Sequence, residues 1–172
     1  MLSDRRPAGP GAFLGWSGIV RLGLVQAAIG AIVVITTSIL NRVQVVELAL
    51  PALLPGVLVA IHYFVQVLRP RLGYGSDIGG RRTPWIIGGI ALLGAGAVGA
   101  TLATTLMPTD LALGIALCVV AFIAVGLGVG ACGTALLVLI STSVAPTRLA
   151  AAATVTWVMM IAGFIVTTVI VG

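Results

Sequence analysis

Long apolar stretches without charged residues alternate with short clusters of charges along this chain. Five stretches contain no Asp, Glu, Lys or Arg, namely residues 22–41, 48–68, 83–109, 111–147 and 149–172. A helix needs about 20 apolar residues, at about 1.5 Å each, to cross about 30 Å of hydrocarbon. The pattern therefore predicts an all-α polytopic membrane protein with five transmembrane helices, at about residues 22–41, 48–68, 84–107, 112–140 and 149–171.

The longest stretch, residues 111–147, is too long for one span and too short for two. A polar segment at residues 141–143 ends the helix expected there, and Pro146 in the turn that follows does not continue a helix comfortably. We therefore divide the chain into an N-terminal cytoplasmic segment, residues 1–20, which lies on the membrane interface, and a membrane domain, residues 21–172.

The composition excludes two other classes of protein. Of the 172 residues, 60% are hydrophobic and 8% are charged, and the mean hydropathy is +1.25. An average soluble domain carries about 25% charged residues, which help to cover its surface. Disordered chains have low hydrophobicity. The chain is therefore neither a soluble globular protein nor a disordered one.

The basic residues predict an orientation. All nine are arginines, and with four acidic residues they give a net charge of +5. Basic residues gather in the cytoplasmic loops of membrane proteins, so this charge is no argument for a nucleic-acid partner. Only Arg42 falls on one side of the predicted topology, whereas eight arginines fall on the other: Arg5, Arg6, Arg21, Arg69, Arg71, Arg81, Arg82 and Arg148. The N-terminus and the 69–82 loop are therefore predicted to be cytoplasmic.

Residue patterns for catalysis or metal binding are missing from the sequence. It has no metal-ligand spacing, no nucleophile–base arrangement and no phosphate-binding loop. No Asp or Glu lies inside the predicted spans, where an ionisable group usually marks ion coupling. We therefore expect no metal site and no enzymatic activity.

Small residues recur at helical spacing in two of the predicted spans. Ala91, Ala95 and Gly99 stand four residues apart in the third span, and Gly126 and Gly130 stand four apart in the fourth. Such seams let two helix backbones approach closely in lipid. We interpret them as helix-packing surfaces, with a ligand-cradling role as the alternative.

The predicted loop between the second and third spans carries the most specific motif. From Gly73 to Arg82 it has the order G-x-x-x-D-x-x-G-R-R, with the acid at Asp77. Gly73 and Gly75 are expected to form a tight reversal of the chain, and Asp77 can pair with a nearby arginine. A loop that only supplied positive charge would not need this order of residues.

This order between two spans resembles motif A of the major facilitator superfamily. The resemblance implies that the chain forms the first five helices of a major-facilitator fold. It also implies that the motif latches the two halves of that fold on the cytoplasmic side, against a partner helix in a half that this chain lacks. The residues that would carry this role are Gly73, Asp77, Gly80, Arg81 and Arg82.

Further segments narrow the resemblance to the PucC/LhaA group, the bacteriochlorophyll-delivery branch of that superfamily in phototrophic bacteria. The similarity covers residues 19–172, the N-terminal portion of such a protein. The segments that carry it are Arg21–Gln26, Asn41–Val43, Val46–Leu48, Arg69–Pro70, Ser76–Ile86 and Trp157–Gly163.

The resemblance implies a function, partners and a location. Such proteins help to assemble light-harvesting complexes, with bacteriochlorophyll as the cofactor that they would bind and hand over. The implied partners are antenna polypeptides, the reaction centre–antenna complex and lipids, in the photosynthetic intracytoplasmic part of the bacterial inner membrane. A cation-coupled, sugar-type transporter of the same superfamily is the alternative, because sucrose-type symporters share the Gly-x-x-Ser-Asp and Gly-Arg-Arg pattern.

Two side chains inside the predicted spans are candidate pigment-binding residues. His62 is the only histidine and lies seven residues before Arg69, about 10 Å inside the cytoplasmic end of its helix. A neutral imidazole can ligate the magnesium of a chlorin, or it can hydrogen-bond to another helix. Trp157 lies deep in the fifth span, where it can stack on a pigment or fill a packing gap. The sequence leaves both alternatives open.

Overall fold

The computed structural model describes residues 13–78 and 82–171, which form helices joined by short connections. Many apolar side chains in these helices are exposed, as expected where the surrounding solvent is lipid. Five helices are long and apolar enough to cross a membrane: Trp16–Glu47, Leu53–Ile78, Arg82–Leu106, Leu111–Ser143 and Pro146–Val171. The prediction of an all-α polytopic membrane protein with five spans is confirmed.

The first span is longer than its predicted range, residues 22–41. Residues 16–20 were assigned to the interfacial segment, but the helix already begins at Trp16. In this first part of the helix Ile19 is buried in the core, whereas Arg21 is exposed. The span consists of α1 (Trp16–Val34), a π-helical stretch (Ile35–Ile39), the short α2 (Leu40–Arg42) and a second π-helical stretch (Val43–Glu47).

The segment predicted as a loop, residues 69–82, is helical for most of its length. The second span runs from α3 (Leu53–Val65) through a 3-10 turn (Gln66–Leu68) into α4 (Arg69–Ile78). Polar and charged side chains reduce the apolar character of α4, but they do not interrupt its hydrogen bonds. Most of the motif therefore extends the second span instead of forming a loop, and residues 79–81 lie outside the described residues.

The glycines of this motif allow α4 to pack closely against neighbouring side chains. A Cβ on Gly73 would lie 3.0 Å from Thr134 of the fourth span, and one on Gly75 would lie 2.9 Å from the Trp85 ring. The hydroxyl of the buried Ser76 donates to the carbonyl oxygen of Gly73 at 2.7 Å. The expected reversal at Gly73 and Gly75 is wrong, because these glycines let α4 pack closely against its neighbours.

The last three spans begin and end close to their predicted limits. Asp110 caps the fourth span, since its side chain accepts a hydrogen bond from the backbone N–H of Leu113 at 3.0 Å. The helices are α5 (Arg82–Leu106), α6 (Leu111–Ser143) and α7 (Leu149–Val171), and a 3-10 turn (Pro146–Arg148) precedes α7.

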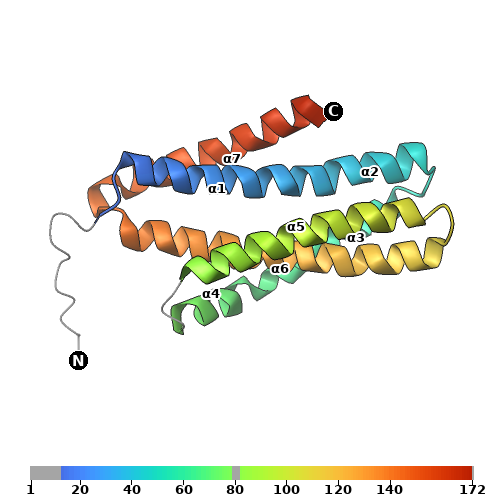
Figure 1. Ribbon diagram of the computed structural model, residues 1–172, viewed down its shortest axis with the longest axis horizontal. Coiled ribbons are helices and arrows are strands. Elements are labelled where there is room, and N and C mark those ends of the chain that lie inside the picture. Colours follow the sequence, from blue (N-terminus) through green and yellow to red (C-terminus); the bar gives the residue numbers. More distant parts are fainter. Residues whose placement is uncertain (1–12, 79–81, 172) are drawn as a thin grey trace.

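The helices form two groups (Figure 1). α1 and α7 lie side by side as a parallel pair along one edge of the molecule. α5 and α6 form an antiparallel hairpin, on which α3 and α4 pack through α6. Arginines lie mainly at the end of the molecule where α1 begins, which we call the arginine-rich end: Arg21, Arg69, Arg71, Arg82 and Arg148.

Glycines bring α5 and α6 into close contact. A Cβ on Gly128 would lie 2.6 Å from the backbone nitrogen of Leu93, and one on Gly89 would lie 2.6 Å from that of Cys132. On another face of α6, a Cβ on Gly126 would lie 2.7 Å from the carbonyl oxygen of His62. α6 therefore contacts a neighbouring backbone closely on two of its faces.

The small residues predicted as a packing surface on α5 lie mostly beside its close contact with α6. Ala91 and Ala95 are exposed, and Gly99 is half-buried with an ordinary contact to Ala121 of α6. The close contact is made by Gly89 and by Gly96, which face the backbone of α6. A packing role for Ala91 and Ala95 stays a prediction.

Candidate functional site

A cavity of about 300 Å³ lies between α1, α3, α6 and α7. Its polar side chains are Gln26 on α1, His62 and Gln66 on the second span, and Arg69 at the start of α4. His62, Gln66 and Arg69 are spaced by four and three residues, so they share one face of the helix. The other lining residues are glycines or have apolar or aromatic side chains, which makes this a largely apolar site with a few polar groups.

His62 is the most buried polar group of the cavity. Its residue is 1% exposed, and its Nε2 atom lies 2.8 Å from Nε2 of Gln66. Its other ring nitrogen, Nδ1, is buried and has no hydrogen-bond partner among the described residues. The close approach of Gly126 to the His62 carbonyl fixes the backbone of α3 at this point. Among the described residues, the imidazole therefore contacts a hydrogen-bonding group through Nε2, and Nδ1 has no such partner.

Gln26 also carries a buried polar atom that has no partner among the described residues. Its Nε2 atom donates to the sulfur of Met160 on α7 at 3.2 Å. Its Oε1 atom is buried and, within the described part of the chain, accepts no hydrogen bond. The sequence analysis did not single out Gln26, although an amide in the middle of an apolar span was a visible signal.

Trp157 lines the same cavity as His62. The structure therefore brings together the two residues that were predicted separately as pigment-binding candidates. Trp157 is 53% exposed, so it covers one side of the cavity without being enclosed. Tyr63 also lines it, with its ring centroid 4.9 Å from that of His62 in an edge-to-face arrangement. Aromatic surfaces and an imidazole thus border one space.

The groups that border the cavity are able to make two kinds of contact. An imidazole nitrogen can ligate a metal, and aromatic rings stack on flat apolar groups. The described residues contain no group of three His, Cys, Asp or Glu side chains that could hold a metal ion by themselves. At about 300 Å³ the cavity is at the lower end of the range for drug-sized ligands.

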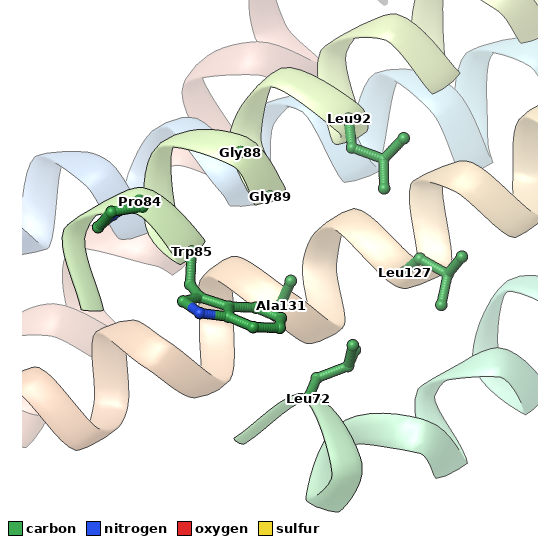
Figure 2. Close-up of a pocket in the computed structure, with 8 residues that line it drawn as sticks. All are labelled: Leu72, Pro84, Trp85, Gly88, Gly89, Leu92, Leu127 and Ala131. Carbon is green, nitrogen blue, oxygen red and sulfur yellow. The ribbon is translucent and has the colours of Figure 1, made fainter. Parts of the chain in front are cut away.

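A second hollow, of about 390 Å³, lies among α4, α5 and α6 at the arginine-rich end (Figure 2). Leu72, Trp85, Leu92 and Leu127 surround it, with Leu92 on α5 and Leu127 on α6. Its lining is apolar apart from the indole N–H of Trp85. It therefore offers surface for acyl chains and no side-chain group for chemistry.

The motif residues come together within this chain. Arg82 forms an ion pair with Asp77 at 3.2 Å and donates to the hydroxyl of Thr142 at 2.9 Å, so it connects the ends of α4, α5 and α6. The expectation that Asp77 pairs with a nearby arginine is confirmed by this contact, whereas a latch against a helix in a half that this chain lacks stays a prediction. Gly80 and Arg81, the other predicted latch residues, lie outside the described residues.

A buried polar cluster at the opposite end was missed from the sequence. Gln44 is 0% exposed, and its Nε2 atom donates to the hydroxyl of Thr104 on α5 at 3.2 Å. The hydroxyl of Thr104 also donates to the carbonyl oxygen of Ala100 at 2.9 Å. The cluster ties the end of the first span to α5, but it lies outside the cavity around His62.

Comparison with known proteins finds relatives whose names refer to bacteriochlorophyll or to PucC. The "Bacteriochlorophyll synthase 44.5 kDa chain" of Rhodobacter capsulatus is 54% identical over 154 residues, which are 90% of this chain and 36% of that protein. "Protein PucC" of Cereibacter sphaeroides is 36% identical over 83 residues, 45% of this chain and 18% of that protein. "Protein PucC" of Rhodobacter capsulatus is 39% identical over 75 residues, 41% of this chain and 16% of that protein.

The chain spans about a third of the length of the first of these relatives and less of the others. No solved structure matches it. The family described as "PUCC protein" matches residues 39–172, which include the second span with His62, the motif and the fifth span with Trp157. The chain therefore belongs to the PUCC protein family.

Proposed function

We propose that this chain is the N-terminal part of a non-enzymatic assembly factor for photosynthetic light-harvesting complexes. In this proposal the protein holds bacteriochlorophyll in the inner membrane and passes it to antenna polypeptides. Membership of the PUCC protein family and the 54% identity to a relative named for bacteriochlorophyll support the proposal. The observation that carries it is the cavity lined by aromatic side chains and by His62, whose Nδ1 has no hydrogen-bond partner among the described residues.

His62 is the residue that would ligate the magnesium of the pigment. A cavity of about 300 Å³ holds only part of the pigment, so the part that carries the metal would lie against His62 and the remainder would project from the cavity. Trp157 is half exposed and offers its indole face to a ring that projects from the cavity. A single axial ligand with partial enclosure suits a carrier that has to release what it binds.

The solute-transporter alternative finds less support in the structure. The ionisable groups on the cavity lining are an imidazole and an arginine, together with the Tyr63 phenol, and none of the described lining residues is a carboxylate. The described acids lie at the ends of the helices, where Asp77 pairs with Arg82 and Asp110 caps α6. The orientation with a cytoplasmic N-terminus belongs to the same proposal and rests on the arginine distribution.

Exchange of His62 tests the pigment-binding role. The full-length protein would be purified from a phototrophic host as the unaltered form, His62→Leu and His62→Gln. We expect bound bacteriochlorophyll, measured by absorption per protein, to fall at least severalfold in His62→Leu, because leucine offers magnesium no lone pair. Glutamine retains hydrogen bonding between helices and so serves as the control for a packing role.

Two outcomes separate ligation from packing. Pigment loss in His62→Leu at unchanged protein abundance supports ligation. Unaltered protein that carries no pigment, or His62→Leu protein that keeps all of its pigment, contradicts it. In either of those cases His62 is a buried residue that pairs with Gln66 within the second span.

A further inference from the structure

We propose that the hollow among α4, α5 and α6 binds an anionic phospholipid, with an acyl chain between the helices and the phosphate group paired with Arg71. The hollow measures about 390 Å³, and its lining is apolar apart from one indole N–H. It shares no lining residue with the cavity around His62, so this inference is independent of pigment binding.

Helix lengths place the outer end of the hollow near the membrane surface. Trp85, which lines the hollow, lies 21 residues before Leu106 at the end of α5. Arg71 lies 18 residues after Leu53 at the start of the second span. At about 1.5 Å per residue these lengths are about 32 and 27 Å, close to the thickness of the hydrocarbon region. Both side chains therefore lie where acyl chains meet headgroups, a level at which tryptophan is enriched.

From this level the hollow continues toward the middle of the membrane. Figure 2 shows Leu92 and Leu127 on the side of the hollow away from Pro84. A further hollow of about 480 Å³ between α5 and α6 starts three residues deeper on each helix, at Ala95 and Ala124, and its lining is apolar. The two spaces follow one seam between α5 and α6, so a hydrocarbon chain can extend along it.

Arg71 supplies a positive charge beside the outer end of the hollow. Arg71, Leu72 and Gly75 share one face of α4 because of their spacing. Leu72 lines the hollow, and a Cβ on Gly75 would lie 2.9 Å from the Trp85 ring. Arg71 is exposed and forms no ion pair with the described residues, whereas Arg82 already has a carboxylate partner.

The charge of this end favours an anionic headgroup. Five described arginines lie at the arginine-rich end, and Asp77 is the one described carboxylate there. A guanidinium group binds phosphate oxygens through two parallel hydrogen bonds, and basic residues beside a groove between transmembrane helices favour anionic lipids. A zwitterionic lipid offers the same acyl chains, but its ammonium group is repelled by the arginines. The site therefore distinguishes lipids by headgroup charge.

Quenching of Trp85 fluorescence by brominated lipids tests the site. The full-length protein, with Trp85 as its only tryptophan, would be placed in phosphatidylcholine vesicles that contain a rising fraction of brominated phosphatidylglycerol. Bromine on an acyl chain quenches an indole only at short range, so the signal reports a chain beside Trp85. We expect brominated phosphatidylglycerol to act at a roughly three- to tenfold lower mole fraction than brominated phosphatidylcholine, as one arginine contact predicts.

Exchange of Arg71 tests the headgroup contact. Arg71→Gln should remove the preference for phosphatidylglycerol, and Arg71→Lys, which keeps the charge, should retain most of it. Arg148→Gln is the matched control, because Arg148 lies at the same end of the molecule but does not adjoin a residue that lines the hollow. An equal loss of preference in Arg71→Gln and Arg148→Gln would indicate attraction to the whole charged end and overturn the site.

Filling the hollow tests the position of the acyl chain. Gly88 lines the hollow, and a Cβ there has no heavy atom within 4 Å, so the side chain of Gly88→Leu projects into the space. Quenching by both lipids should fall severalfold in this variant. It should stay unchanged in Gly56→Leu, whose exposed glycine on α3 is equally open but lies outside the hollow.

Two results with the unaltered protein contradict the proposal. Equal quenching by the two brominated lipids would mean that the hollow does not select a headgroup. No quenching by either lipid would mean that another part of the protein covers the hollow. Neither result bears on pigment binding, which the His62 variants test separately.

Discussion

Gln66 decides which nitrogen of His62 is available. The contact of 2.8 Å joins Nε2 of the amide and Nε2 of the imidazole, so with the amide in this orientation Gln66 donates and the ring proton lies on Nδ1. If the Gln66 amide is rotated by half a turn, its Oε1 accepts a hydrogen bond from Nε2–H of His62. Nδ1 of His62 then carries a free lone pair. Only the second arrangement lets Nδ1 ligate a metal.

Two opposite substitutions of Gln66 test this control. Gln66→Glu introduces a carboxylate, which only accepts hydrogen bonds, so the His62 proton stays on Nε2 and Nδ1 remains free to ligate. Gln66→Lys introduces an ammonium group, which only donates hydrogen bonds, so the His62 proton stays on Nδ1 and this nitrogen cannot ligate a metal. We expect Gln66→Glu to retain pigment and Gln66→Lys to bind it roughly ten- to hundredfold more weakly, measured by pigment titration of purified protein.

Both Gln66 substitutions are also made in the His62→Gln protein, which controls for the effect of burying a charge. Both substitutions place a charge at the same position, so a general loss of stability would affect both. In the His62→Gln protein the difference between them should vanish. A difference that persists there would mean that Gln66 acts independently of His62.

Close helix contacts make α6 the central element of the chain. It touches α5 through Gly128 and α3 through Gly126, and it carries Thr134 against α4. The atoms opposite Gly128 and Gly126 belong to the backbone, which cannot move aside as the end of a flexible side chain can. These contacts therefore fix the distance between helices and, with it, the walls of the cavity.

Adding one methyl group tests the contact between α5 and α6. Gly128→Ala places a Cβ 2.6 Å from the backbone of Leu93, so we expect a loss of stability of about 1–3 kcal/mol. Gly88→Ala is the control, because a Cβ there has no heavy atom within 4 Å and alanine favours the helix. Thermal unfolding in detergent would compare them, and equal midpoints would contradict the close contact.

The sequence predicted the spans well because hydrophobic length is a local property. It located all five, and it placed the limits of α5 and α7 within a few residues. It was wrong about the 69–82 segment, where glycines were taken as signals for a turn. Whether Gly73 turns the chain or allows a close helix contact depends on Thr134, which lies far away in the sequence. Local patterns do not contain that information.

At the scale of the whole molecule, the cavity arises between helices that are distant in sequence. Gln26, His62 and Trp157 come from the first, second and fifth spans. The sequence marked His62 and Trp157 by their chemistry, but it gave no reason to place them together and passed over Gln26. The major-facilitator arrangement expected from motif A stays a prediction, as does the orientation in the membrane.

Cysteine labelling tests the orientation. Ser76, although part of the motif, is fully buried and unsuitable, whereas Ile78 at the end of α4 is 70% exposed. We expect a membrane-impermeant maleimide added to cells with a permeabilised outer membrane to label Pro108→Cys between α5 and α6, and to leave Ile78→Cys unlabelled until the inner membrane is opened. The two native cysteines are buried and provide the background. The reverse labelling pattern would invert the proposed topology.

The first span is fastened near both of its ends and borders the cavity in between. Close to its start, the backbone N–H of Leu14 donates to the carbonyl oxygen of Ser143 at 2.8 Å, and close to its finish Gln44 donates to Thr104. Between these points it is also held against α7, where a Cβ on Gly163 would lie 2.5 Å from the carbonyl oxygen of Ala27. The wall that this span gives to the cavity is therefore stiff, and a change in the width of the cavity requires α1 and α7 to move together as one rigid unit.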